Sequence, residues 1–593
     1  MKKKKDKEKL KEKFKLVNIM NNDSMKLFSM LSLYFLLVLI IYTLFQFINF
    51  NSGLSIVQIL SLIIPIIVYL LVNKDKTIKV KLIIISTYLF LLLILPFIYN
   101  KTYDLTVDGN SYHKTAIAFI KNGWNPLYET SKEFQKNNQN IIPFDDDTRI
   151  DLWIEHYPKA TWIIAATIYN MTGNIESGKC MTLIFSIMLF IIAFNCLRTI
   201  LDKRWAFLIT GIVVFNPIVL AQFFSYYIDG LMGAFFIIEL LLLFMIDPKE
   251  KVSNYYSVWL ALISTCAIFV NLKFTGLLCS GVIAAVFYFY WLIVNRKEKN
   301  LFAIFKRITI PFIIVYVIAI FLVGSNSYVQ NTVQHLNPLY PLIGKDKVDI
   351  ITTMQPKSFG EKNMIEKFAI SLFAKTENTT YDMPDPELKW PIKLYRSEIG
   401  ELFAPDIRIG GFGPFFALIF LVSLVLLIAS LIIFIKKEKK NLKYVVLPTL
   451  AVIITMILVG ENWWARYVPQ LYLLPVGALI LSIYVAKYIN LKRIKTKYIY
   501  LIPLGLMCII GLNVGCFAFI NYRNVKSFVE ISNDIKEMKK EKECELHLAA
   551  DKLYGYYYTL KDNGVNYKEI GEIKDYKYVY NWRFMVENKW KNI

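Results

Sequence analysis

Apolar runs of about 17–25 residues recur along the sequence and constrain its fold more than any other feature. A helix of about 20 apolar residues spans the roughly 30 Å of hydrocarbon in a bilayer. Because 56% of the 593 residues are hydrophobic and are gathered in such runs, a single soluble core is excluded. We predict an all-α polytopic membrane protein with about 13 transmembrane helices. The predicted spans are 27–50, 54–73, 82–99, 180–197, 205–222, 229–246, 255–272, 275–294, 309–324, 411–435, 444–460, 467–486 and 498–520.

Clusters of lysine and arginine between the runs orient the predicted spans, because basic loops favour the cytoplasmic side. They account for the net charge of +22, so we predict no nucleic-acid partner. If these loops and the N-terminus are cytoplasmic, the spans alternate correctly, provided that the short apolar segment 158–172 does not cross. We therefore expect a multi-pass protein of the cell membrane. Its predicted parts are a basic cytoplasmic tail (1–26), a polytopic domain (27–520) with large outer loops at 100–157 and 326–410, and a small extracytoplasmic C-terminal domain (521–593).

The first outer loop begins with two carboxylates four residues apart, Asp104 and Asp108, directly after a predicted span. A partly desolvated carboxylate at the membrane surface can act as a general base or as a metal ligand. The alternative is structural, with Asp108 or Asn110 capping the helix that follows. His156, at the end of the same loop, either faces the same cleft or makes a structural hydrogen bond.

Three further turns bring charge to the predicted outer face, at Asp229, Lys273 and Arg466. Cations on that face suit an anionic headgroup or a phosphate. The alternative is that the lysine and the arginine snorkel to the interface beside its aromatic residues. Glu239 lies in the middle of a predicted span, and we interpret it as a protonated or partnered core residue.

In order along the chain, the stretches 108–113, 156–158, 227–230, 272–276 and 465–469 resemble the GT-C superfamily of membrane glycosyltransferases. The resemblance is nearest to the bacterial relatives of protein O-mannosyltransferases and the aminoarabinose lipid A transferase (glycosyltransferase family 39-like). It implies an inverting transfer of a sugar from a polyprenyl-phosphate donor to a glycan, lipid or protein acceptor at the outer membrane face.

The resemblance also implies roles for individual residues. Asp108 would be the catalytic base, with Asp104 as the alternative, and Lys273 and Arg466 would lie near the donor phosphate. Further candidate substrate-binding residues in the matching stretches are Tyr112, His113, His156 and Asp229. Many family members carry adjacent acidic residues where this chain has Asp108 followed by Gly109. The choice of base therefore stays open, and a divalent metal is possible but not indicated.

Two other functions compete with this one. A transporter or flippase of a lipid-linked sugar would show ionisable residues in mid-span and broken helices at the bilayer midplane. A surface-polysaccharide polymerase or ligase would use the same lipid-linked sugars on another fold.

Overall fold

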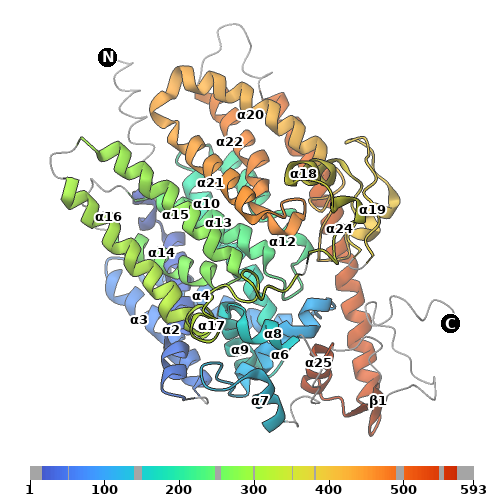
Figure 1. The fold of residues 1–593 in the computed structure, drawn as a ribbon. Coiled ribbons are helices and arrows are strands. Elements are labelled where there is room, and N and C mark those ends of the chain that lie inside the picture. The colour runs from blue at the N-terminus through green and yellow to red at the C-terminus, as the bar shows by residue number, and fades with distance from the viewer. Residues whose placement is uncertain are drawn as a thin grey trace.

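The computed structural model describes residues 16–50, 53–138, 150–246, 255–297, 301–349, 351–379, 382–488, 500–546 and 553–569, and these are almost entirely helical (Figure 1). The first fifteen residues of the predicted basic tail lie outside these ranges. Within the described residues, nine helical stretches are long and apolar enough to cross a membrane. They are Asp23–Phe47, Leu54–Val72, Ile78–Tyr99, Ile175–Leu197, Phe274–Asn295, Phe305–Val323, Phe416–Asn441, Pro469–Tyr488 and Leu501–Met538. The predicted polytopic, all-α fold is confirmed.

The long elements of the bundle follow the apolar runs. They are α2 (Asp23–Phe47), α3 (Leu54–Val72), α4 (Ile78–Leu89), η2 (Phe90–Ile94), α5 (Leu95–Tyr99), α10 (Cys180–Leu197), α13 (Asp229–Phe244), α14 (Tyr255–Val270), α15 (Phe274–Asn295), α16 (Leu301–Tyr316), η5 (Val317–Val323), α20 (Phe416–Glu438), α21 (Lys443–Val459), α22 (Leu473–Tyr488) and α24 (Leu501–Met538).

The connecting elements are shorter. They are η1 (Leu16–Asn21), η3 (Gly109–His113), α6 (Lys114–Lys121), α7 (Ser131–Asn137), α8 (Ile150–His156), α9 (Ala160–Thr172), η4 (Ile175–Lys179), α11 (Lys203–Val214), α12 (Pro217–Ala221), η6 (Ser325–Val329), α17 (Gln330–His335), η7 (Lys357–Phe359), α18 (Met364–Phe373), α19 (Arg396–Glu401), η8 (Lys439–Asn441), η9 (Ala465–Tyr467), η10 (Pro469–Tyr472), α25 (Gly555–Asp562), and the parallel strands β1 (Cys544–Leu546) and β2 (Tyr567–Glu569).

The predicted count of about 13 spans is not confirmed, and the reason is visible at 205–222. This run forms two helices, α11 and α12, which are separated at Asn216-Pro217. The Asn216 side chain accepts a hydrogen bond from Ile218 N and caps α12, and proline is favoured in the first turn of a new helix. α13 and α14 are apolar but have 16 residues each.

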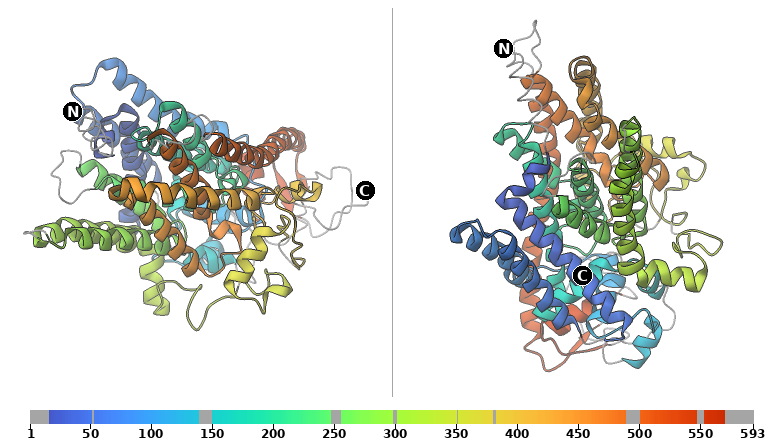
Figure 2. Two further views of the ribbon diagram at one scale, coloured as in Figure 1. Left: turned by 90° about the horizontal axis from the view of Figure 1, so that it is seen from above. Right: turned by 90° about the vertical axis from the view of Figure 1, so that its left-hand side faces the viewer.

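Burial separates central from peripheral helices. In the stretches Ile175–Leu197 and Pro469–Tyr488, 78% of the apolar window is buried, so both lie inside the bundle. The corresponding fraction is 22% in Phe416–Asn441 and 28% in Leu54–Val72, so these helices lie at its edge. Their exposed leucines and isoleucines are the surface that a bilayer covers. Figure 2 shows the helices of the edge around the core from two further sides.

The connecting elements of the first large loop gather at one end of the bundle, beside the C-terminal end of α24 (Figure 1). There α9 is buried and has 13 residues. Because that length corresponds to about 20 Å, it is too short to span a bilayer. The predicted boundary between residues 520 and 521 falls inside α24, which continues as one helix to Met538. Beyond it, α25 packs against η3 and α6 of the first loop.

Candidate active site

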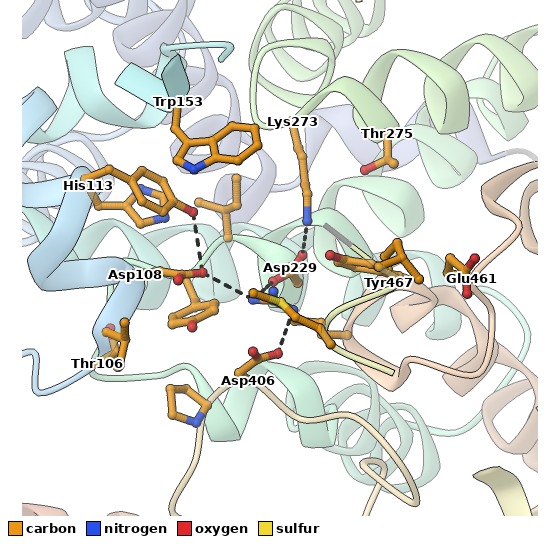
Figure 3. A pocket seen from close by; sticks show the side chains of 18 of the residues that line it. Thr106, Asp108, His113, Trp153, Asp229, Lys273, Thr275, Asp406, Glu461 and Tyr467 are labelled. Atoms are coloured by element: carbon orange, nitrogen blue, oxygen red, sulfur yellow. Dashed lines mark hydrogen bonds and ion pairs between the residues drawn. The ribbon is translucent and has the colours of Figure 1, made fainter. Parts of the chain in front are cut away.

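A cavity of about 1020 Å³ opens where the predicted outer segments meet (Figure 3). Its walls come from the start of the first large loop, the ends of α8 and α9, the turns before α13 and α15, the second large loop and the turn before η10. The polar and aromatic side chains that line it include Thr106, Asp108, Tyr112, His113, Trp153, Tyr157, Trp162, Tyr227, Asp229, Lys273, Asp406, Glu461, Arg466 and Tyr467. Six of the predicted site residues are therefore on one cavity.

Asp108 directly precedes η3 and presents its carboxylate to the cavity. The side chain is 28% exposed, and its Oδ2 lies 3.5 Å from Arg466 Nη1. The Tyr112 hydroxyl donates a long hydrogen bond, also of 3.5 Å, to the same oxygen. Burial of the carboxyl group raises the pKa of Asp108, and the charge of Arg466 opposes that rise. Asp108 is thus a partly exposed carboxylate that has long contacts with Arg466 and Tyr112 and an increased proton affinity.

Arg466 lies at the centre of three carboxylates. Its Nε is 2.9 Å from Asp406 Oδ1, and its Nη1 is 3.5 Å from Asp108 Oδ2 and 3.8 Å from Asp229 Oδ2. The guanidinium group also lies against the rings of Tyr227, Trp464 and Tyr467. Despite the short distance to Asp406, Nε makes no well-aligned hydrogen bond within the described residues. Arg466 is therefore fixed by charge and by aromatic faces, and its Nη1 makes only long contacts with Asp108 and Asp229.

Lys273 reaches the cavity from the turn between α14 and α15. Its Nζ donates a 2.9 Å hydrogen bond to Asp229 Oδ1 and lies 4.4 Å from the centre of the Tyr467 ring. The turn is tight, since a Cβ on Gly276 would come within 2.0 Å of Phe269 O. Asp229 is the first residue of α13, and its second oxygen accepts from Gln222. Asp229 therefore holds Lys273 and faces Arg466.

His113 is a neutral ring at the wall of the cavity. Trp162 Nε1 donates a 2.8 Å hydrogen bond to its Nδ1, so its proton is on Nε2. Burial lowers the pKa of His113 to about 3, which keeps the ring uncharged at neutral pH. His113 can donate a hydrogen bond to a bound molecule but carries no charge for it.

Asp406, in the second large loop, is a site residue that sequence reasoning missed. Its Oδ2 accepts a 2.7 Å hydrogen bond from Arg408 Nη2, and its Oδ1 accepts from Trp464 Nε1 at 3.1 Å. The backbone around it pairs with the η9 turn, where Arg466 N donates to Ile407 O. The available signal was an acidic residue two positions before Arg408, next to a glycine-rich turn.

Asp104, the alternative base, does not line the cavity. It is fully buried, and its two oxygens accept backbone hydrogen bonds of 2.9 Å from Thr106 N and 2.7 Å from Tyr226 N. Burial raises its pKa, against the opposing charges of Lys114 and Lys179. Its carboxylate fastens the loop and is closed to a substrate.

Asp104 also explains why Asp108 is followed by glycine. A Cβ on Gly109 would lie 2.2 Å from Asp104 Oδ2 and 2.5 Å from Thr106 Oγ1. An acidic residue at position 109 therefore has no room.

His156 is likewise away from the cavity. Its Nδ1 is 2.8 Å from Asn331 Oδ1, and its ring packs edge-on against Tyr340. Through these contacts it joins α8 to the second large loop, as the structural interpretation of a loop histidine expects. Its neighbours Trp153 and Tyr157 reach the cavity instead.

No set of three or more His, Cys, Asp or Glu side chains in the described ranges is placed to hold a metal ion. Three carboxylates of the cavity, those of Asp108, Asp229 and Asp406, surround Arg466.

No family model and no curated protein matches the sequence. Among solved structures, the chain is similar to a crystal structure of ArnT from Cupriavidus metallidurans bound to undecaprenyl phosphate. The sequence identity is 11%, the match covers 82% of this chain and 86% of that chain, and the TM-score is 0.45.

Proposed function

We propose that the chain is a GT-C-type glycosyltransferase that moves a sugar from a polyprenyl-phosphate donor to an acceptor hydroxyl at the outer face of the membrane. The observation that carries the proposal is the meeting of Asp108, Lys273 and Arg466 on one open cavity. A carboxylate that can accept a proton and two cations that can hold a phosphate are the groups that such a transfer needs.

The charges of the cavity support a phosphate beside Lys273 and Arg466. Asp229 is paired with Lys273, and Asp406 lies between Arg408 and Arg466, whose Nη1 faces Asp108 at 3.5 Å. Arg466 Nη1 reaches Asp108 and Asp229 only at 3.5 and 3.8 Å, and the Lys273 ammonium has three donors. Both cations can therefore add hydrogen bonds to phosphate oxygens while keeping their present carboxylates.

In the proposed reaction, Asp108 accepts the proton of the acceptor hydroxyl as its oxygen attacks the anomeric carbon. The bond from that carbon to the phosphate oxygen breaks, and its electron pair stays on the phosphate. Lys273 and Arg466 stabilise the charge that grows there, which lowers the barrier most when the donors are already in position. Attack opposite the leaving phosphate inverts the anomeric carbon. The raised pKa of Asp108 suits it to take up the proton.

The remaining residues of the cavity are suited to position the sugar. Tyr112 contacts Asp108, and neutral His113 can offer its Nε2 proton to a sugar hydroxyl. The aromatic rings of Trp153, Tyr157 and Tyr467 supply apolar faces against which a sugar packs.

The test is sugar transfer by purified protein in liposomes. Undecaprenyl-phosphate sugars with a labelled sugar are supplied as donors, with a membrane extract as the acceptor source. We expect label in the acceptor fraction, with release of undecaprenyl phosphate. If the labelled donor instead crosses the bilayer intact, the protein is a transporter and the proposal is wrong. The cavity lining supports transfer over transport, because it does not include the mid-span Glu239.

A further inference from the structure

The segment Leu388–Leu394 of the second large loop exposes apolar side chains and includes a turn in which Lys393 N donates to Trp390 O. Its four alternate residues Leu388, Trp390, Ile392 and Leu394 are 63%, 78%, 71% and 44% exposed. Between them, Lys389 points inward and its Nζ is buried against Glu398 at 2.5 Å. With its buried lysine and its exposed apolar side chains, the segment has the pattern of a surface that faces lipid.

The polar contacts of the segment place it at the level where α20 begins. Lys389 Nζ donates a 2.7 Å hydrogen bond to Pro414 O, two residues before α20. Leu388 pairs with Ala374 just after α18, and α18 packs on α20 through Phe368 and Phe420. The segment is thus tied twice to the cavity end of a membrane-spanning helix.

The helix that follows the segment also packs on a spanning helix. Ile399 of α19 and the adjoining Leu402 join a cluster with Phe517 and Ile520 of α24. Figure 1 shows α18 and α19 beside α20 and α24. Because Phe517 and Ile520 lie at the end of the predicted span 498–520, this contact places α19 beside the predicted membrane boundary of α24.

We propose that Leu388–Leu394 is a membrane-interface anchor whose apolar face inserts into the lipid leaflet on the cavity side. Tryptophan is enriched at that depth of a bilayer, and Lys393 and Arg396 flank the apolar face as partners for anionic headgroups. The same chain continues through α19 to Phe403 and Asp406 in the cavity wall. The anchor therefore holds that wall at a fixed height relative to the leaflet.

The anchor can be tested without any substrate. In the full chain, the cysteines that are not buried (Cys508, Cys516 and Cys544) are changed to Ala, and one reporter cysteine is added, as Trp390→Cys or Ile392→Cys. Each reporter is labelled with an NBD fluorophore in liposomes, with or without lipids that carry a doxyl quencher near the top of the acyl chain. Glu361→Cys, an exposed position of the same loop, is the control.

We expect blue-shifted emission and at least twofold quenching at positions 390 and 392, and neither change at position 361. Because both reporter side chains are largely exposed, their substitution removes few contacts, and the two positions report independently. Emission at 390 and 392 that matches position 361 would overturn the anchor. Disulfide cross-linking of Trp390→Cys between two copies, without lipid quenching, would assign the apolar face to a second copy and would also overturn it.

Discussion

Two clusters of opposite charges lie a few residues apart in this protein, on the two sides of η3. The buried cluster, defined by Asp104, Lys114, Glu176 and Lys179, is fully inaccessible. Glu176 contacts each of the two lysines at 2.5 Å, and Thr559 of α25 donates to Glu176 at 2.6 Å. The open cluster, defined by Asp108, Asp229, Lys273, Asp406 and Arg466, lines the cavity, and Arg466 reaches two of its carboxylates only at 3.5 and 3.8 Å.

The difference in accessibility and contact distance suits the buried cluster to a structural role and the open cluster to a chemical one. Charges that are buried and saturated by short contacts hold segments together, because no donor or acceptor is left for a ligand. Here they join α6, η4 and α25, so the C-terminal segment supports the part of the first loop that contains Asp108. Charges that are accessible and loosely paired can exchange partners with a bound molecule. Substitutions in the buried cluster should therefore change stability, and substitutions in the open cluster should change ligand binding or turnover.

The largest expected effect is loss of stability from the buried cluster. Glu176→Gln removes the anion between two buried lysines, and breaking such a group costs about 3–5 kcal/mol. Thermal unfolding in lipid nanodiscs should show a clear drop in Tm, whereas Glu361→Gln, an exposed control, should not. An unchanged Tm in Glu176→Gln would mean that the buried cluster does not fasten these segments.

Asp104→Asn should also act on stability. The amide keeps one acceptor oxygen, but its NH₂ group would face the N–H of Tyr226 or of Thr106, which leaves a buried donor unpaired. We expect a cost of about 1–3 kcal/mol in the free energy of unfolding. We expect a lower Tm but little change in turnover per folded molecule. A loss of turnover at unchanged Tm would instead make Asp104 the base.

A smaller effect is expected for Lys273→Gln, which removes one cation from the open cluster. Undecaprenyl phosphate binding, measured by titration in nanodiscs, should weaken about tenfold, which equals roughly 1.4 kcal/mol. The exposed Lys357→Gln is the matched control, because it removes the same charge outside the cavity. Equal affinities for the two variants would remove Lys273 from the proposed phosphate site.

The smallest effect is on the pH profile. Only the ionised Asp108 can accept a proton, so turnover should rise with pH as this group loses its proton. Because burial raises its pKa, the acid limb should lie above the ordinary aspartate value of 3.8. Turnover is measured as a function of pH. An acid limb with its midpoint at or below 3.8 would contradict the burial of the Asp108 carboxyl group.

The sequence was sufficient for the parts of the molecule that rest on local pattern. Long apolar runs predicted helices such as α2, α15 and α20, since length and hydropathy alone decide whether a helix spans a bilayer. The same criterion failed at 205–222, where Asn216-Pro217 starts a new helix inside an apolar run. That Asn-Pro pair was the signal that could have divided the run.

The candidate site was predictable only in part, because most of it depends on contacts between distant segments. Asp108, Lys273 and Arg466 were found from their positions at the ends of predicted spans. Asp406 was missed because its contact with Arg466 joins an irregular loop to a turn 60 residues away, and no periodic pattern marks either. Nor could spacing separate Asp104 from Asp108, since only the fold of η3 turns one inward and the other toward the cavity.

The most direct test of the account is the turnover of Asp108→Asn in the liposome transfer assay, measured beside Glu361→Gln and normalised to folded protein. Loss of a general base predicts a fall of about 100-fold or more, with a Tm close to that of the unaltered chain because the Asp108 side chain is partly exposed and its contact with Arg466 is 3.5 Å long. Unaltered turnover in Asp108→Asn would contradict the assignment of the open cluster as the catalytic site.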